Sequence, residues 1–375
     1  MTLWDPILLS KSKLRKDLLL NYTKELPPND TQTIVYISFS AFDTTNIIDF
    51  DEEDGKFSVS GYLEVSWIDP RVAMNWASSP GFQTEDFPLY LKDSEVWTPL
   101  IRQINAYSRS DFENMVEETV MFHRDGSALM VKMDIFTTEC KTNYRYFPFD
   151  TQECSIDMVI WGSFMGETIL KAHNSTINKA LYKKTYNWNL EDASISVDSI
   201  DGFRNKRTSE VQRARIKFKI KRNSTYYVCF LILPFIILQS LQPFVFLMPR
   251  DCGERASFSV TVLLSIAVYL TIVVDHIPKT PESDISLLGI KMVIDVFTGA
   301  CFQVFVILRH RFNNKICRSK VELCKVSKDS ENTSPSPEND TGKGETTDLK
   351  DFCLTLFMVG ISHTYTIWIY LSSEV

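Results

Sequence analysis

The chain has 375 residues, of which 44% are hydrophobic, and a formal net charge of −7. This length allows two or three domains. The negative charge, and the lack of a basic stripe interleaved with aromatic residues, argue against nucleic acid as a partner. Most charged residues precede position 222 or lie between 309 and 351, and the rest of the chain is almost purely apolar.

The first 26 residues predict an amphipathic surface helix at the N-terminus. Its apolar residues, among them Ile7, Leu14 and Leu18, are interrupted by charged side chains. An amphipathic helix buries one such stripe and exposes the other face. The interruptions also exclude the continuous apolar core of a signal peptide.

Residues 31–222 predict an all-β domain. The segments 33–40, 56–68, 127–138 and 213–221 alternate between polar and apolar residues, and turn residues separate them. Alternation with a period of two is typical of half-buried strands, and short strands of this kind favour a β-sandwich. The segment contains no serine-hydrolase, zinc-protease or phosphate-binding glycine motif, so we expect neither an enzyme nor a cofactor or metal site.

Two features predict that this half is extracellular. Cys140 and Cys154 are its only cysteines and could form a disulfide, which would be stable in an oxidising compartment. Asn21, Asn29 and Asn174 each begin an Asn-X-Thr sequence that can accept a glycan.

Four apolar runs follow, at residues 223–249, 256–274, 285–308 and 352–371. Each is long enough to cross a bilayer as a helix, although any one of them alone could be a buried core helix. The third run contains Lys291 and Asp295, which are four residues apart and can pair on one helical face. The basic residues between 309 and 320 predict a cytoplasmic position, and the Ser/Thr/Pro-rich segment 326–350 predicts a disordered linker.

These observations divide the chain into an extracellular sandwich (1–222), three membrane helices (223–312), a short cytoplasmic linker (313–350), and a fourth membrane helix with an extracellular C-terminus (351–375). We therefore expect a multi-pass protein of the plasma membrane, in contact with lipid, with both termini outside the cell.

Several motifs occur together in this order: two cysteines that flank Phe147-Pro148-Phe149, a β-rich extracellular half, and four membrane helices. The chain resembles a subunit of the pentameric ligand-gated ion channels, the Cys-loop receptors, and is nearest to the nicotinic and serotonin-gated cation channels. The resemblance implies an immunoglobulin-like sandwich, a four-helix transmembrane bundle and a Cys140–Cys154 disulfide. It also implies that the chain assembles with four copies of itself into a homopentamer.

The second membrane run resembles the pore helix of that family. One face, at a spacing of three and four residues, carries carboxylates at both ends, hydroxyls near the inner end and aliphatic residues elsewhere. Five copies would form rings that attract monovalent cations and an apolar ring that can close the path. The seven residues of this face are Glu254, Ser257, Thr261, Leu264, Val268, Ile272 and Asp275.

The resemblance also implies an agonist site between subunits, which in this family holds a cationic ligand among aromatic residues. Trp161 and Tyr62 match that pattern, but Ile104 stands where the nicotinic branch has a tyrosine. The capping loop of this family, here roughly residues 199–212, contains only one aromatic residue, Phe203, and is rich in basic residues, which continue with Arg213. We expect these charges to repel a quaternary ammonium, so the small-molecule agonist stays unidentified.

A third set of residues is expected to couple ligand binding to the pore. The resemblance assigns this role to Phe147, Pro148 and Phe149 in the disulfide loop, to Arg222 before the first membrane helix, and to Pro278 after the second. Glu52 lies in the acidic run 49–54, which we interpret as a turn close to Arg222; divalent-cation binding is the alternative.

The interpretation that follows is a cation-selective ligand-gated channel subunit. Two alternatives remain: a non-conducting or regulatory member of the same family, and a membrane-anchored binding protein without a pore.

Overall fold

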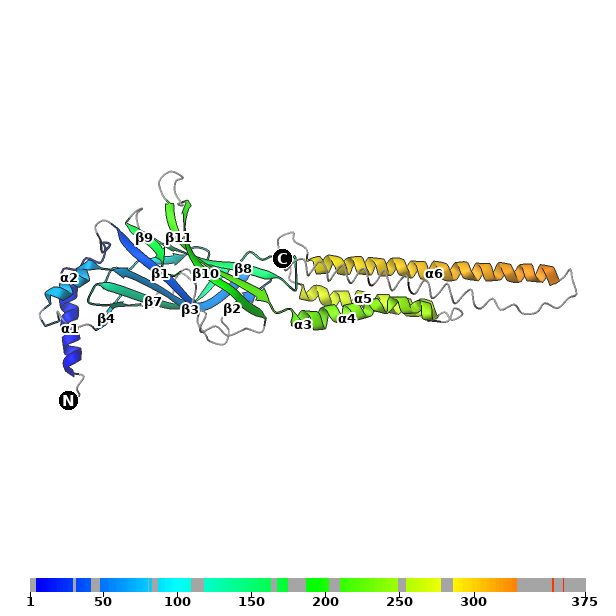
Figure 1. Ribbon diagram of the computed structural model, residues 1–375, viewed down its shortest axis with the longest axis horizontal. Coiled ribbons are helices and arrows are strands. Elements are labelled where there is room, and N and C mark those ends of the chain that lie inside the picture. The colour runs from blue at the N-terminus through cyan, green and yellow to red at the C-terminus, as the bar shows by residue number, and fades with distance from the viewer. Residues whose placement is uncertain are drawn as a thin grey trace. The chain divides into compact units, whose positions relative to one another are not determined.

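The computed structural model describes residues 5–29, 32–41, 48–79, 81–82, 87–108, 118–162, 167–174, 187–201, 210–248, 254–277 and 286–328, and single positions 353 and 360. The chain forms two compact units. The first comprises residues 1–142 and 151–222, and the second comprises residues 143–150 and 223–375. Figure 1 shows strands in the first unit and long helices in the second.

The first unit is a sandwich of two sheets, as the alternating segments predict. The larger sheet has the order β4 (Leu89–Lys92), β6 (Thr119–Phe122), β7 (Ser127–Glu139), β3 (Lys56–Ile68), β1 (Thr33–Ala41) and β9 (Thr168–Ala172), and β2 (Ile48–Asp51) also pairs with β3. The smaller sheet has the order β10 (Trp188–Asp201), β11 (Glu210–Arg222), β8 (Thr151–Ile160) and β5 (Ile101–Gln103). All pairs are antiparallel except β1–β9.

Alternate residues of both sheets form one core between them. On β11, the apolar positions Ala214, Ile216, Phe218 and Ile220 are all buried, as the sequence alternation predicts. Phe218 meets Phe57 of β3 across the sandwich, with ring centroids 5.5 Å apart. The polar residues between them therefore lie on the outer face of the smaller sheet.

The described residues of this unit include two helices. Helix α1 (Asp5–Leu19) buries Leu14 and Leu18, consistent with the predicted amphipathic helix. Helix α2 (Pro70–Ser78) begins after Asp69, whose carboxylate accepts a hydrogen bond from the backbone N–H of Arg71. This cap satisfies one of the amide groups that the first helical turn leaves without a partner.

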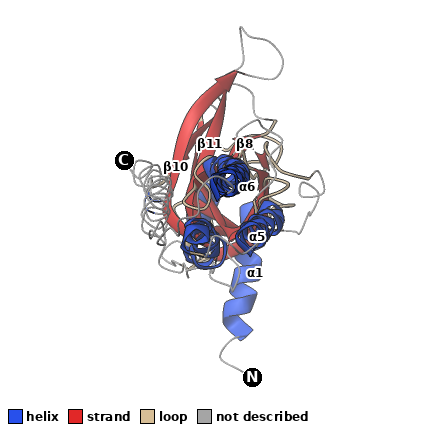
Figure 2. Ribbon diagram, turned by 90° about the vertical axis from the view of Figure 1, so that its right-hand side faces the viewer, coloured by secondary structure: helices blue, strands red, loops and turns tan. Residues whose placement is uncertain are grey.

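The second unit contains three helical segments long and apolar enough to cross a membrane, counted over the described residues. The first spans Thr225–Leu247 and comprises α3 (Thr225–Tyr227), a π-helical turn (Val228–Ile232), α4 (Leu233–Ser240) and a 3-10 helix (Gln242–Leu247). The others are α5 (Glu254–His276) and α6 (Leu287–Lys328), which pack against each other (Figure 2).

Helix α6 continues past the predicted end of the third membrane helix. The sequence interpretation ends the third helix near residue 312, but α6 continues to Lys328. No glycine or proline occurs between Ala300 and Ser334, so nothing in this stretch interrupts helical hydrogen bonding. The fourth predicted membrane helix, 352–371, and most of the linker lie outside the described residues.

Candidate functional site

The seven predicted pore residues lie on one exposed face of α5, which we call the α5 stripe. Glu254, Ser257, Thr261, Leu264, Val268, Ile272 and Asp275 are all exposed. The opposite face of the helix buries Ser259, Val262, Ile266 and Val273 against the rest of the unit. Leu264 is 61% exposed, whereas Ile266, two residues later, is fully buried. The stripe therefore has no cover among the described residues of its own chain.

Arg255 follows Glu254 directly in the first turn of α5 but binds away from the stripe. Its guanidinium donates hydrogen bonds to the carbonyl oxygens of Met248 and Phe246, at the end of the first membrane segment. It therefore satisfies carbonyls that a helix end leaves without partners. The charge of Arg255 is held toward that helix end, and the neighbouring Glu254 remains exposed on the stripe.

The candidate ligand residues lie on two different surfaces of the sandwich. Trp161 follows β8, is 55% exposed, and shares the alternation of Asp157 and Val159 on the outer face of the smaller sheet. Its backbone N–H donates to the carbonyl of Leu100, just before β5. Ile104, just after β5, donates its N–H to the carbonyl of Asp157. Both residues therefore flank the same β5–β8 pair.

Tyr62 lies on a different surface from Trp161 and Ile104. It lies on β3, where residues alternate between the core and the outer face of the larger sheet, and Tyr62 takes an outer position. Its partner across the strands is Met133, which is 67% exposed. Because the two outer faces point away from the shared core, one chain cannot bring Tyr62 and Trp161 into a single site.

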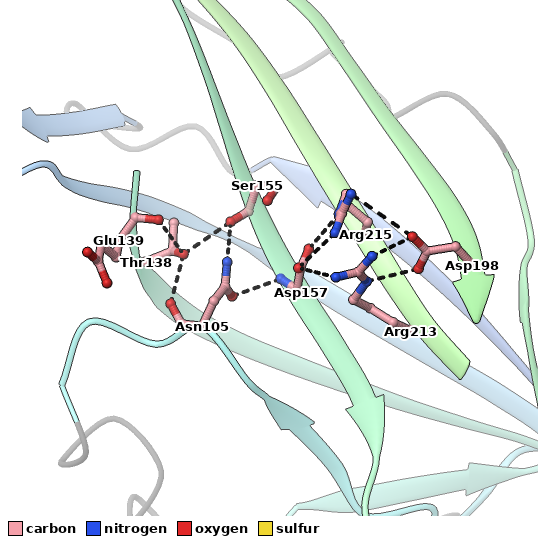
Figure 3. Close-up of polar contacts among 8 residues, drawn as sticks. All are labelled: Asn105, Thr138, Glu139, Ser155, Asp157, Asp198, Arg213 and Arg215. Atoms are coloured by element: carbon pink, nitrogen blue, oxygen red, sulfur yellow. Dashed lines mark hydrogen bonds and ion pairs between the residues drawn. The ribbon is translucent and has the colours of Figure 1, made fainter. Parts of the chain in front are cut away.

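Four charged residues on the outer face of the smaller sheet, which also carries Trp161, form what we call the arginine cluster: Asp157, Asp198, Arg213 and Arg215 (Figure 3). Asp157 accepts hydrogen bonds from Arg213 and from Nε of Arg215, each over 3.1 Å. Arg213 also donates to Asp198, which lies opposite it on β10. This hydrogen bond holds the pKa of the Asp198 carboxyl below its usual value and raises the pKa of the guanidinium.

The cluster corrects one expectation from the sequence. Two arginines and two aspartates balance in charge, so Arg213 is not a free cation that would repel an ammonium group. The remaining basic residues of the capping loop, at positions 204, 206 and 207, lie outside the described residues, as does Phe203.

Asn105 fixes Asp157 from the other side (Figure 3). Its amide donates to the carbonyl of Ser155 over 2.8 Å, and its side-chain oxygen accepts from the N–H of Asp157 over 2.9 Å. The carbonyl of Asn105 accepts from the hydroxyl of Thr138 on β7. The cluster is thereby connected to the larger sheet.

The predicted contact between Glu52 and Arg222 is present within the first unit. Arg222 occupies an inward position at the end of β11 and is 3% exposed. Both of its terminal nitrogens donate to the Glu52 carboxylate, at 2.6 and 2.9 Å, and the guanidinium lies 4.3 Å from the ring of Trp188. A buried guanidinium needs such a partner. Nearby, Asp51 accepts hydrogen bonds from the N–H groups of Glu53 and Asp54, so part of the acidic run forms a turn.

The disulfide loop divides between the two units. Cys140 and Cys154 form the predicted disulfide in the first unit. The tip, residues 143–150, belongs to the helical unit. There Phe147 is fully buried, and its ring meets that of Tyr227 at 5.0 Å. The backbone N–H of Leu287, at the start of α6, donates to the carbonyl of Arg145. Phe147 and Tyr144 are therefore core residues of the helical unit, whereas Tyr146 is 37% exposed.

Comparison with known families decides the class of the protein. Residues 11–224 match the neurotransmitter-gated ion-channel ligand binding domain, and residues 231–339 match the neurotransmitter-gated ion-channel transmembrane region. The chain belongs to the neurotransmitter-gated ion-channel family.

Three relatives illustrate the breadth of this channel family. The chain is 26% identical to ligand-gated ion channel 4 of Caenorhabditis elegans over 71% of its length and 41% of the relative. It is 24% identical to acetylcholine receptor subunit beta of Xenopus laevis, over 81% of the chain and 63% of the relative. It is also 24% identical to neuronal acetylcholine receptor subunit alpha-2 of Gallus gallus, over 72% and 50%. The chain therefore spans less than two thirds of the length of each.

Within this channel fold, the sequence interpretation missed the arginine cluster as a unit. Asp157, Arg213 and Arg215 occupy outward positions of two predicted strands, so alternation places each on a sheet face. The register that sets Arg215 opposite Asp157, and Arg213 opposite Asp198, depends on strand pairing far apart in the sequence. Pro278 and the linker that follows α5 lie outside the described residues.

Proposed function

We propose that the chain is one subunit of a homopentameric, cation-selective, ligand-gated ion channel in the plasma membrane. The observation that carries this proposal is the α5 stripe. All seven of its residues are exposed, and the stripe ends in a carboxylate at each side. Lipid does not stabilise carboxylates or hydroxyls, so a polar stripe on a membrane helix calls for water, ions or other copies.

Five such stripes around an axis give a cation-selective path. Rings of Glu254 and Asp275 attract monovalent cations and repel anions, and the hydroxyls of Ser257 and Thr261 can replace part of an ion's hydration. Each tenfold preference needs only ~1.4 kcal/mol, and unit charges 4 Å apart interact by about 1 kcal/mol even in water. Rings of Leu264 and Val268 can close the path by excluding water.

The agonist site is proposed to lie between two copies. Trp161 and Tyr62 occupy outer faces of opposite sheets, so only two chains can bring them together. The surface around Tyr62 supports this arrangement, because Val131, Met133 and Ile135 of β7 are exposed side by side. An exposed apolar strip of this kind is typical of an interface. The agonist is a small molecule, and a cationic group on Trp161 is compatible with the charge-balanced arginine cluster.

Coupling between ligand and pore is proposed to use the Glu52–Arg222 pair, the loop tip with Phe147, Pro148 and Phe149, and the linker with Pro278. The buried position of Phe147 and the bidentate ion pair support the proposal, because both contacts are costly to break. A fourth membrane helix at 352–371 would complete a four-helix bundle and place the C-terminus outside. Asn21, Asn29 and Asn174 would then be glycosylated.

The test is the reversal potential of the channel under a salt gradient. Leu264→Ser wets the apolar ring, so we expect it to open the channel without an agonist. In this background, Glu254→Ala should reduce the preference for sodium over chloride by about tenfold or more. Asp275→Ala is the matched control and should have a smaller effect, because it lies at the wider mouth. A pore that prefers chloride, or that ignores Glu254→Ala, contradicts the proposal.

A non-conducting or regulatory member of the family is the second candidate. Ile104 favours it, because an aliphatic residue replaces an aromatic one beside β8. Under this alternative, Leu264→Ser would reach the cell surface as a pentamer and still carry no current.

A further inference from the structure

Pro234 creates a local deficit of hydrogen bonds in the first membrane segment. It follows the π-helical turn Val228–Ile232 and occupies the second position of α4. Proline has no backbone N–H, so it cannot donate to the carbonyl of Phe230, four residues earlier. Inside a bilayer no water replaces such a bond, and each missing partner is costly.

A side chain of α5 reaches this position. The hydroxyl of Tyr269 donates to the carbonyl of Phe230 over 2.6 Å and to that of Leu231 over 3.2 Å. Its ring stacks against Phe235 of α4, with centroids 6.3 Å apart and planes inclined by 28°. The donors and acceptors all belong to the helical unit.

Tyr269 lies next to the α5 stripe in sequence but points elsewhere. It follows Val268 directly, and successive residues of a helix point about 100° apart. Val268 is 54% exposed, whereas Tyr269 is half-buried against the neighbouring segment. A rotation of α5 that moved Val268 would therefore also move the Tyr269 hydroxyl away from two fixed carbonyl oxygens.

We propose that Tyr269 is a positioning residue for the pore: its hydroxyl takes the place of the amide that Pro234 lacks and fixes the rotation of α5 against α4. The part that concerns the pore rests on the proposed channel function. The hydrogen bond itself does not, so the two are tested separately.

The first test is a double-mutant cycle on thermal stability, which needs no current. Full-length protein in detergent is heated, and the fraction that stays soluble is measured for Tyr269→Phe, Pro234→Ala and the double variant. Tyr269→Phe should lower the midpoint by about 2–4 °C. Pro234→Ala restores a backbone N–H near the carbonyl of Phe230. In that background, Tyr269→Phe should therefore lower the midpoint clearly less. An equal loss in both backgrounds overturns the proposal.

Two further variants keep this cycle decisive. Tyr226→Phe is the matched control, because Tyr226 is 55% exposed in the same membrane segment, and its loss of a hydroxyl should leave the midpoint unchanged. If Pro234→Ala fails to assemble, Pro234→Leu supplies the same N–H with a side chain of larger apolar volume.

The second test distinguishes positioning from mere stability. In the Leu264→Ser background, Tyr269→Phe should change the ratio of open to closed time by about fivefold, the amount that one net hydrogen bond supplies. The single-channel conductance should stay unchanged, because the hydroxyl is not on the stripe. A changed conductance with an unchanged open time overturns the positioning role. An absence of current in every variant contradicts the channel function instead, and the thermal cycle still decides the hydrogen bond.

Discussion

The α5 stripe and the arginine cluster are two groups of polar residues in the described part of the chain, and their surroundings are opposite. The stripe is exposed along its whole length, on a helix whose other face is buried. In the cluster, Asp157 is 7% exposed and both arginines are paired within the chain. Polar groups without cover call for partners from outside, whereas paired charges hold their own strands in place.

This difference distinguishes charged residues that stabilise the fold from charged residues that act on ions, which composition alone does not. Arg213 and Glu254 are both charged residues at predicted functional positions. Glu254 is exposed, whereas the charge of Arg213 is paired with the carboxylates of Asp198 on β10 and Asp157 on β8. We therefore expect substitutions in the cluster to reduce stability first, and substitutions in the stripe to change ion flow first.

Removal of Asp157 tests this difference between the cluster and the stripe with the largest expected effect. Asp157→Ala leaves Arg215 without its principal acceptor in a position that is 28% exposed. Removing one partner of a buried ion pair costs about 3–5 kcal/mol, and we expect the low end, about 3 kcal/mol, because the two arginines are 15% and 28% exposed. Chemical unfolding of the detergent-solubilised protein measures this loss.

Glu153→Ala is the matched control, since Glu153 is an exposed carboxylate on the same strand, and it should cost less than ~0.5 kcal/mol. Equal losses for the two variants would mean that the cluster does not hold the strands.

The next largest expected effect is a difference in stability between substitutions on the two faces of α5. Ile266 is fully buried, so Ile266→Ala removes packing and should cost about 2 kcal/mol, the low end for such changes because bilayer and core are equally apolar. Leu264→Ala should leave stability within ~0.5 kcal/mol and should change channel opening. The fraction of protein that stays soluble on heating measures the stability of each variant, and the current measures its channel opening. A larger stability loss for Leu264→Ala would mean that the stripe packs inside its own subunit.

These contrasts also explain what the sequence could predict. The strands β1, β3, β7 and β11, and the stripe, follow from periodicities of two and 3.6 residues, which depend only on neighbours in the chain. The inward position of Arg222 follows from the same alternation, because it continues the buried series Ala214 to Ile220. A buried arginine then demands a carboxylate, which Glu52 provides.

The remaining features depend on tertiary pairing. No local pattern indicates that Arg213 finds Asp157 and Asp198, or that the Tyr269 hydroxyl meets the segment that Pro234 interrupts. The extension of α6 to Lys328 is not marked by the charge pattern, because charge marks the membrane boundary but does not end a helix.

The smallest effect concerns the pH dependence of the cluster. Arg213 lowers the pKa of the Asp198 carboxyl in the folded chain. A lowered pKa means that the folded state favours the carboxylate, so the resulting stability is complete above the unfolded pKa of about 3.9 and is lost as the pH falls through the folded value. Because the Asp198 side chain is 42% exposed, solvent screening limits the contribution to less than ~1 kcal/mol. Asp198→Asn should therefore lower the unfolding midpoint slightly at pH 6, and the difference from the unchanged protein should shrink toward pH 3. A difference that instead grows on acidification would mean that Asp198 is not held as the carboxylate by Arg213.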